Sequence, residues 1–382
     1  MSKKIGIMTY SRSINYGSAL QAFALAYCLK DLGYDVEIID YVQRNYGLNY
    51  SLFKAPFSLN AIKYDIIHFL FFNTLKRRDA KFSHFRKYVL PMSKTQYKFG
   101  DDLSELDSEY DVMICGSDQI WNPKATDFDT NYFLPFIKHS SKISYAVSIN
   151  GGDLKYIENS GRILSDLLSF KALSVREDSG KADLTSFLSS KKEVSVLLDP
   201  TLLNPAQVYS AISSSRLVKE RYIFFYSVNF KEEAVESAIT LSERTGLPVY
   251  TLFTGGNRTV LKVKKRFIFA TKSVGVEDFI SFIKYSDYVV TNSFHGTAFS
   301  VIFEKNFFSI GLTDKNGDLI PDARICHLLG LLGIESRFVS KEMIKMVNLS
   351  ETIDYLQVNE RRQEGIMKSI SYLKESIGGM QS

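Results

Sequence analysis

The sequence is poor in cysteine and has no long apolar run, and both absences narrow its class. Its 382 residues include three cysteines, Cys28, Cys115 and Cys326, which form no CxxC pair. This spacing argues against a disulfide scaffold, a zinc ribbon or an iron–sulfur cluster, and we expect no metal site. The sequence contains no run of 18 apolar residues, so no membrane span is predicted. The apolar run at the start is too short for a signal peptide. We therefore expect a reduced, cytoplasmic protein.

Motifs for common cofactors are also missing. Neither GxGxxG nor GxxxxGK[ST] occurs, so neither dinucleotide nor P-loop nucleotide binding is predicted, and no cofactor is expected. No helix-turn-helix, zinc-finger or RNP signature indicates nucleic acid. What the sequence does contain, 45% hydrophobic and 23% charged residues, is typical of a globular chain of about two or three domains.

Positive charge is concentrated in one block, residues 54–98, which holds ten Lys or Arg residues and two acidic ones. Within this block, the apolar and aromatic segment 66–72 is followed closely by Lys76, Arg77 and Arg78. Aromatic residues beside basic ones are typical of a helix that lies on an anionic membrane surface, and we predict peripheral membrane contact through residues 62–87. Burial of the same segment as an ordinary core helix is an equally good interpretation.

Predicted strands and helices alternate along the chain. A strand at 4–8, a helix that ends near Leu32 and a strand at 36–39 form a βαβ unit, which predicts a parallel sheet. Two prolines within six residues, Pro200 and Pro205, mark a connection. The further predicted strands are 111–115, 143–147, 172–175, 194–198, 222–228, 249–253, 267–269, 288–291 and 307–310. The further predicted helices are 160–170, 179–188, 232–244, 277–285 and 297–304.

This alternation predicts an α/β fold of two doubly wound, Rossmann-like domains facing a cleft, with a C-terminal helix. The expected domains are 1–204, which includes the basic block, and 205–345. A tail at 346–382 follows, whose apolar residues have helical spacing. Ligands of such sheets bind at the carboxyl ends of the strands, so polar residues at those ends are the functional candidates.

Two candidate sites lie in the first predicted domain. At Asn15-Tyr16-Gly17, backbone N–H groups of a helix start are suited to an anion, and a simple helix cap is the alternative. Ser117, Asp118, Gln119 and Trp121, the only tryptophan, follow the strand at 111–115. Hydrogen-bonding side chains beside an indole suit a sugar ring, and a core position for Trp121 is equally compatible with the pattern.

The third candidate is His295, which follows the strand at 288–291 and precedes a helix predicted to begin near Gly296. The positive end of a helix dipole favours anions. Histidine exchanges protons near neutral pH, which makes His295 the candidate acid and base. Arg176, Arg258 and Arg324 are candidates for binding an anionic substrate, because the guanidinium fork matches carboxylate and phosphate. A surface ion pair is the alternative for each arginine.

Taken together, these segments resemble the polysaccharide pyruvyl transferase family. They run in order from residue 5 to residue 310. The resemblance implies a fold similar to GT-B glycosyltransferases. It also implies transfer of a pyruvyl group from phosphoenolpyruvate to a sugar, giving a cyclic ketal for bacterial capsule, exopolysaccharide or cell-wall polymer synthesis. The matching stretches are GIMTYSRSINYGSALQAFAL, DVMICGSDQIWNP, ISYAVSIN, LSVRED, LLDPTLL and SVGVEDFISFIKYSDYVVTNSFHGTAFSVIFEKNFFSI.

The resemblance also implies roles for individual residues. The family's catalytic histidine corresponds to His295, and donor binding is assigned to Ser293 and Gly296 of the same turn with basic residues. Many members have Arg-x-His-Gly where this chain has Ser293-Phe294-His295-Gly296, so Arg176, Arg258 or Arg324 is predicted to replace that arginine. The acceptor, expected to be a lipid-linked saccharide, is assigned to Asn15, Tyr16, Gly17, Ser117, Asp118, Gln119 and Trp121.

Two other functions remain compatible with the sequence. One is a GT-B-type glycosyltransferase that uses a nucleotide-sugar donor. The other is a non-catalytic glycan-binding protein on the same scaffold, which the missing arginine at position 293 suggests.

Overall fold

The computed structural model describes residues 2–46, 65–66, 68–157, 160–228, 230–253 and 263–378. These residues form two compact units, each with a parallel sheet and helices, which confirms the predicted α/β fold class. Unit 1 comprises the described residues within Met1–Tyr50, His84–Asn204 and Arg362–Ser382, and unit 2 comprises those within Ser51–Ser83 and Pro205–Arg361.

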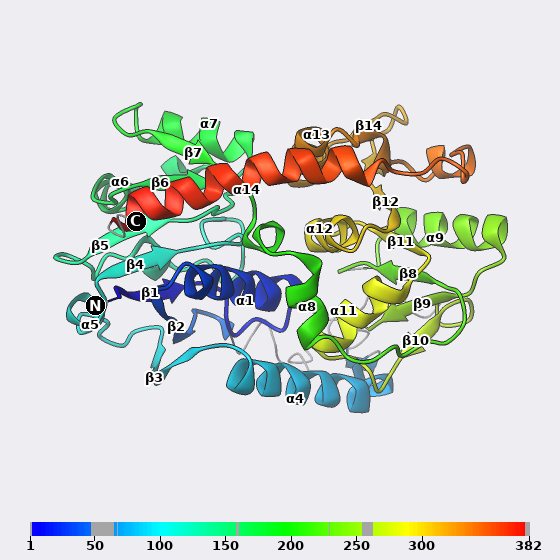
Figure 1. Ribbon diagram of the computed structural model, residues 1–382, viewed down its shortest axis with the longest axis horizontal. Coiled ribbons are helices and arrows are strands. Elements are labelled where there is room, and N and C mark those ends of the chain that lie inside the picture. The colour runs from blue at the N-terminus through cyan, green and yellow to red at the C-terminus, as the bar shows by residue number, and fades with distance from the viewer. Residues whose placement is uncertain are drawn as a thin grey trace. The chain divides into compact units, whose positions relative to one another are not determined.

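Unit 1 contains a five-stranded parallel sheet in the order β3-β2-β1-β4-β5 (Figure 1). A parallel pair, β6 and β7, continues from β5 through a bridge between Ile143 and Ala172. The strands are β1 (Lys4–Met8), β2 (Asp35–Val42), β3 (Met92–Lys98), β4 (Val112–Cys115), β5 (Ser141–Ser144), β6 (Leu173–Val175) and β7 (Val194–Val196). The helices are α1 (Tyr16–Asp31), α5 (Leu106–Glu109), α6 (Ser160–Leu168) and α7 (Asp178–Phe187), with 3-10 turns η1 (Thr130–Phe133), η2 (Leu154–Tyr156) and η3 (Pro200–Leu203).

The first helix of unit 1 shows why this sequence forms these elements. Asn15 caps α1, because its side-chain oxygen accepts a hydrogen bond from the Gly17 N–H at 2.9 Å. Gly33 follows the helix with φ +89°, a backbone conformation that glycine adopts without strain. Because α1 is apolar on nearly every side, it is buried on nearly every side, and it packs on β2 and η3.

Unit 2 contains a six-stranded parallel sheet in the order β10-β9-β8-β11-β12-β15. Its strands are β8 (Ile223–Tyr226), β9 (Val249–Leu252), β10 (Ile268–Ala270), β11 (Tyr288–Thr291), β12 (Asn306–Ile310) and β15 (Phe338–Val339), with a small hairpin of β13 (Leu312–Thr313) and β14 (Leu319–Ile320). Its helices are α8 (Ala206–Ile212), α9 (Glu232–Thr245), α11 (Val276–Tyr285), α12 (Phe294–Ile302) and α13 (Ala323–Leu332), with 3-10 turns η4 (Glu335–Arg337) and η5 (Met343–Lys345).

The central strand β8 of unit 2 is apolar on both faces, as a parallel strand covered by helices requires. Its alternate residues point to opposite sides of the sheet. Ile223 and Phe225 belong to the core that includes Ala234 and Leu241 of α9. Phe224 stacks on Phe282 of α11, with ring centroids 5.3 Å apart. Helices α9 and α11 therefore cover opposite faces of the sheet.

The helix α4 (Phe72–Tyr88) begins in unit 2 and ends in unit 1. Just before it, the Phe71 ring stacks on Phe253 at 4.0 Å between centroids, and Leu75 is buried in the same core of unit 2. Further along, Phe85 packs against Phe23 of unit 1. The prediction that the whole basic block belongs to the first domain is therefore wrong for its described residues up to Ser83.

The C-terminal helix α14 (Tyr355–Ile377) is also shared. Its later residues pack on unit 1: the Tyr372 hydroxyl donates to the Ser144 carbonyl at 2.8 Å, and the Leu198 N–H donates to Ser369 Oγ at 3.3 Å. The predicted separate tail at 346–382 is thus incorrect, because these contacts make its second half part of unit 1. Across the described residues, no helix is both long and apolar enough to cross a bilayer.

Candidate functional site

The turn that carries His295 lies at the carboxyl end of β11, in the middle of the unit 2 sheet. Helix α12 begins at Phe294, two residues earlier than the predicted start near Gly296, so His295 lies in its first turn. Ser293 is the N-cap, and its hydroxyl oxygen accepts a hydrogen bond from the Gly296 N–H at 3.4 Å. The histidine therefore stands where the partial positive charge of the helix is concentrated.

Close packing holds this turn in place. A Cβ on Gly296 would lie 2.3 Å from Thr291 Oγ1, so only glycine allows α12 to approach the end of β11 so closely. The Thr291 hydroxyl donates to the Tyr226 carbonyl at 2.7 Å, and the Thr297 and Ser309 hydroxyl oxygens are 2.6 Å apart. Thr291 thus ties the end of β11 to β8, and Thr297 ties the start of α12 to β12.

The His295 side chain is 7% exposed, and the Phe294 ring meets it edge to face, with centroids 5.2 Å apart. Directly after β11, Asn292 Oδ1 is buried and has no hydrogen-bond partner among the described residues. An imidazole, an amide and the N-terminus of a nine-residue helix meet at one strand end. Such a set can bind an anion and exchange a proton with it.

Arg176, a predicted donor-binding residue, is buried in unit 1 with 3% of its surface exposed. Its Nη1 donates to Asp199 Oδ2 at 2.8 Å, and Glu177 is the second acidic neighbour, 3.7 Å from Nε. Burial alone would lower the pKa of this guanidinium, but the two carboxylates outweigh burial and raise it. The charge of Arg176 is therefore neutralised inside unit 1 by two carboxylates, and its predicted role in donor binding stays a prediction.

The other two predicted arginines have different outcomes. Arg324 lies in unit 2, at the start of α13, and forms an ion pair with Asp322 in which Nη2 and Oδ2 are 2.8 Å apart. Burial of Asp322 opposes ionisation, yet the hydrogen bonds and charge of Arg324 hold the Asp322 pKa below its usual range. Arg258 lies outside the described residues.

The two sequence segments predicted to bind the acceptor meet in unit 1, at the carboxyl ends of the adjacent parallel strands β1 and β4. The Ser18 hydroxyl donates to Asp118 Oδ2 at 2.5 Å, and the Ser117 N–H donates to Gln21 Oε1 at 3.1 Å. Gly116 adopts φ +128° here, and a Cβ on it would lie 2.3 Å from the Tyr145 carbonyl oxygen. This glycine allows the chain to turn at the strand end.

Most of the predicted acceptor residues are occupied within unit 1. Asn15 caps α1, while Tyr16, Gly17 and Ser117 are buried. Asp118 is buried as well, and it accepts hydrogen bonds from the Ser18 hydroxyl and from the Gln119 N–H, the latter at 2.9 Å. Gln119 remains partly exposed, and its Oε1 accepts hydrogen bonds from Asn122 and Asn150.

Trp121 is completely buried, and its predicted role as a stacking platform for a sugar is wrong. Its indole stacks on Phe133 at 5.1 Å between centroids and meets Phe170 edge to face at 5.9 Å. The indole N–H donates to the Tyr132 carbonyl at 3.0 Å. The tryptophan therefore belongs to the unit 1 core, the alternative that the sequence left open.

A second polar group, not singled out from the sequence, stands at the same edge of the unit 1 sheet. Asp127 is partly exposed, and Oδ1 accepts a long hydrogen bond from the Tyr10 hydroxyl at 3.4 Å. Gln43, directly after β2, donates to Asp127 Oδ2 at 3.5 Å. Burial raises the pKa of Asp127, and the charge of Asp118 adds to that rise.

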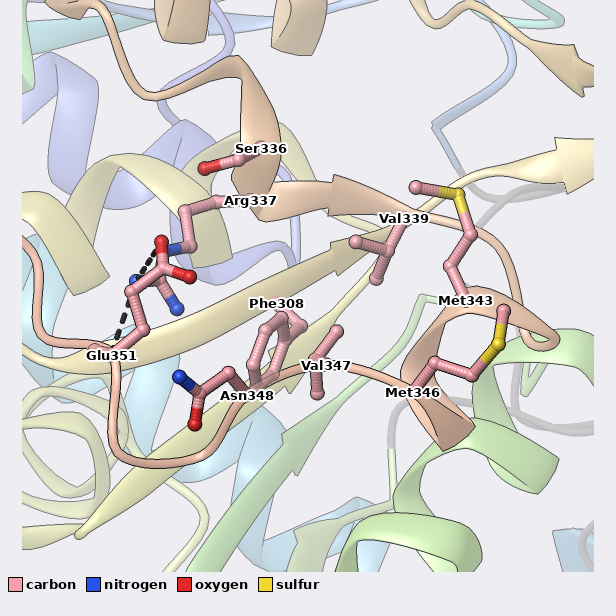
Figure 2. A pocket seen from close by; sticks show the side chains of 9 residues that line it. All are labelled: Phe308, Ser336, Arg337, Val339, Met343, Met346, Val347, Asn348 and Glu351. Carbon is pink, nitrogen blue, oxygen red and sulfur yellow. Dashed lines mark hydrogen bonds and ion pairs between the residues drawn. The ribbon is translucent and has the colours of Figure 1, made fainter.

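A cavity of about 310 Å³ opens at the β15 edge of the unit 2 sheet, and Figure 2 shows its lining. Arg337 and Glu351 are joined on one side of this cavity, with the guanidinium also 5.5 Å from the Phe308 ring centroid. Met343 and Met346 stand on the opposite side. Of the predicted site residues that the structure describes, none lines this cavity.

Comparisons with known proteins found a matching family model and similar solved structures. The family model described as polysaccharide pyruvyl transferase matches residues 15–314. The curated proteins gave no match. A UDP-GlcNAc 2-epimerase of Methanocaldococcus jannaschii has a similar structure, with TM-score 0.53 and 12% identity over 97% of this chain and 100% of the other.

Two further structures are similar to this chain. A putative UDP-N-acetylglucosamine 2-epimerase of Listeria monocytogenes has TM-score 0.52 and 9% identity over 96% of this chain and 91% of the other. A UDP-forming trehalose-phosphate synthase of Burkholderia xenovorans has TM-score 0.51 and 8% identity over 99% of each chain. At these identities the likeness establishes the fold, which is the GT-B type that the sequence predicts.

Proposed function

Since the chain belongs to the polysaccharide pyruvyl transferase family, we propose that it moves a pyruvyl group from phosphoenolpyruvate to a sugar of a bacterial surface-glycan precursor. The product would be a cyclic ketal across two hydroxyls, with release of phosphate. The observation that carries this proposal is the placement of His295 in the first turn of α12, at the carboxyl end of a central parallel strand.

The chemistry of the donor fits that placement. Phosphoenolpyruvate carries a phosphate and a carboxylate, and the N-terminus of α12 favours negative charge. The reaction begins with a proton added to C3, which the imidazolium of His295 would donate as general acid. That step makes C2 electrophilic, and it requires no metal or redox cofactor.

The remaining steps balance without further reactants. One sugar hydroxyl attacks C2 and loses its proton, after which the bond from C2 to the phosphate oxygen breaks and phosphate leaves with the electron pair. A second hydroxyl then closes the ring and also loses a proton. Of the two protons that the hydroxyls release, one replaces the proton that the acid gave to C3, and the other is taken up by the leaving phosphate. The enzyme must therefore supply an acid, a base and an oriented diol.

Phosphate release from phosphoenolpyruvate tests this function. The purified chain is incubated with phosphoenolpyruvate and, in turn, galactosyl, mannosyl and N-acetylhexosaminyl acceptors. We expect phosphate release with at least one acceptor and none without acceptor. Consumption of a UDP-sugar in its place would establish a glycosyltransferase, and saccharide binding without turnover of either donor would establish a glycan-binding protein. Either result contradicts the proposal.

We also propose that unit 2 contacts an anionic membrane, which would bring the enzyme to a lipid-linked acceptor. Ile66, Phe69 and Leu70, just before α4, are exposed, and Phe69 is 73% exposed. Lys76 and Arg77 are exposed within α4, and Lys264 lies 5.6 Å from the centroid of the Phe71 ring. Apolar side chains flanked by cations suit an anionic lipid surface. Phe71 and Leu75, by contrast, are core residues, so the interpretation as a core helix also holds for part of this segment.

Flotation with vesicles of anionic lipid tests the membrane contact. At low ionic strength, where attraction is greatest, we expect the chain to float with the vesicles. The double variant Phe69→Ser/Leu70→Ser should bind at least about tenfold more weakly, since burying one such side chain contributes about 1.5–3 kcal/mol. Leu356→Ser, at a residue that is likewise 73% exposed, is the matched control and should bind normally. No flotation of the unaltered chain at low salt would refute the contact.

A further inference from the structure

Three buried side chains near the carboxyl ends of β1 and β2 carry polar atoms without a hydrogen-bond partner. They are Gln43 Oε1, Tyr132 Oη and Ser11 Oγ, each unpartnered among the residues that the structure describes. Gln43 is 2% exposed, Tyr132 is fully buried and Ser11 is 3% exposed. A buried polar atom that lacks a partner costs about 1–3 kcal/mol, and a hydrogen-bonding ligand or water that reaches it removes that cost.

Two of these side chains, Gln43 and Tyr132, lie near the carboxylate of Asp127. The Gln43 amide is directed at Asp127, because Nε2 donates to Oδ2 at 3.5 Å, which leaves Oε1 of the same amide for another donor. The Tyr132 ring meets Tyr10 edge to face at 5.2 Å between centroids, and the Tyr10 hydroxyl donates to Asp127. The partly exposed carboxylate of Asp127 thus contacts the buried amide of Gln43 and the hydroxyl of Tyr10.

The hydrogen bonds that Asp127 receives from the Tyr10 and Gln43 side chains are long, at 3.4 and 3.5 Å, whereas strong bonds to a carboxylate are about 2.7–2.9 Å. The Asp127 backbone N–H also donates to its own carboxylate. Nearby Asp129 is bound much more firmly: Tyr41 Oη donates to it at 2.5 Å and the Asn131 N–H at 2.9 Å. Asp127 therefore retains acceptor capacity that Asp129 has already used.

From this geometry we infer that Asp127 and Gln43 bind two neighbouring hydroxyls of a saccharide. The inference rests on the proposed function only in identifying that saccharide as the acceptor. One hydroxyl donates to the Asp127 carboxylate and its neighbour donates to Gln43 Oε1.

The surroundings of Asp127 suit this role. The titratable groups that interact with it are Tyr10 from the loop after β1, and Asp118 and Tyr132 from the connection between β4 and β5. Burial raises the pKa of the Asp127 carboxyl, and the charge of Asp118 adds to that rise, so its carboxylate is a stronger hydrogen-bond acceptor than that of an exposed aspartate. Because these neighbours are acidic or neutral, they attract hydroxyl donors and not anions.

Asp127→Asn tests the contact with the carboxylate, because it keeps the size of the side chain and removes its negative charge. We expect the acceptor KM in the phosphate-release assay to rise about tenfold or more, with the KM for phosphoenolpyruvate unchanged. Gln43→Met, which keeps the volume and removes the acceptor atom, should raise the acceptor KM about tenfold at nearly constant kcat. Asp35→Asn, at the opposite end of β2, is the matched control and should behave as the unaltered chain. A wild-type acceptor KM in Asp127→Asn would overturn the assignment.

Direct binding separates this inference from the proposed function. Saturation-transfer NMR with methyl galactoside, methyl mannoside and methyl N-acetylglucosaminide needs no donor. We expect binding of at least one glycoside by the unaltered chain and by Asp35→Asn, and strongly reduced binding by Asp127→Asn and Gln43→Met. Absence of turnover with this pattern intact would refute pyruvyl transfer and leave the binding site standing. Equal binding by all four proteins would refute the binding site.

Discussion

Replacing His295 by alanine is expected to lower acceptor-dependent phosphate release from phosphoenolpyruvate by about 10²–10⁴-fold, the usual contribution of a general acid. The physical reason is position: the imidazole lies in the first turn of α12, where the helix terminus favours the anionic donor. Without the imidazole, water must protonate C3 of the donor. The measurement is kcat at a saturating acceptor concentration, obtained by detecting the phosphate that is released.

The control for this prediction is His327→Ala, which removes a histidine from α13 in the same unit and should leave turnover unchanged. Because His295 is nearly buried, the thermal unfolding of both variants must be compared with that of the unaltered chain. A folded His295→Ala protein with near-normal kcat would remove this residue from the mechanism.

Asp199→Ala is expected to destabilise unit 1 by about 3–5 kcal/mol, the range seen when one partner of a buried ion pair is removed. The variant leaves the Arg176 guanidinium charged in an environment where 3% of the residue is exposed. It also removes the cap of η3, because Asp199 Oδ1 accepts hydrogen bonds from the Thr201 N–H and hydroxyl at 2.9 and 2.7 Å. Urea unfolding measures the loss, with fluorescence of Trp121 reporting on the unit 1 core.

Two further variants separate the cost of the buried unpaired charge from the loss of an ordinary ion pair. Glu236→Ala removes a carboxylate from an ion pair with Lys341 at 3.0 Å in which both side chains are well exposed, and little change is expected. The double variant Arg176→Met/Asp199→Leu should recover part of the loss, because it removes the buried charge along with its partner. If Asp199→Ala is as stable as the unaltered chain, the buried pair does not hold unit 1 together.

The sequence predicted the central elements of the fold well, because buried parallel strands are short apolar runs that stand out. The strand predicted at 288–291 is β11, and the helix predicted at 232–244 is α9, observed to Thr245. The strand β3 was missed because most of its side chains are polar and exposed at the sheet edge, so it has no apolar run.

The division into units could be predicted only in part. The connection between Asn204 and Pro205 separates unit 1 from unit 2 along the chain, as the two prolines suggest. The apolar segment 66–72 allowed burial as a core helix, but the sequence cannot say which core receives Phe71 and Leu75. That choice depends on contacts with Phe253, a residue far away in the sequence.

The candidate site shows the same limit. The turn at His295 is local, so its strand, cap and helix could be read from consecutive residues. The pairs Ser18–Asp118 and Gln43–Asp127 join residues 100 and 84 positions apart, and their meeting depends on the strand order of unit 1. Trp121 and Arg176 were assigned to ligands because composition alone does not distinguish a buried aromatic or ion pair from an exposed one.

The central claim, pyruvyl transfer that starts with protonation of the donor, is tested most directly by running the phosphate-release reaction in heavy water. Mass spectrometry of the acceptor should reveal a gain of one pyruvyl ketal whose methyl group carries a single deuterium, in amounts equal to the phosphate released. An acceptor that gains no pyruvyl group while phosphoenolpyruvate remains intact, or that gains a sugar from a nucleotide donor, would contradict the account.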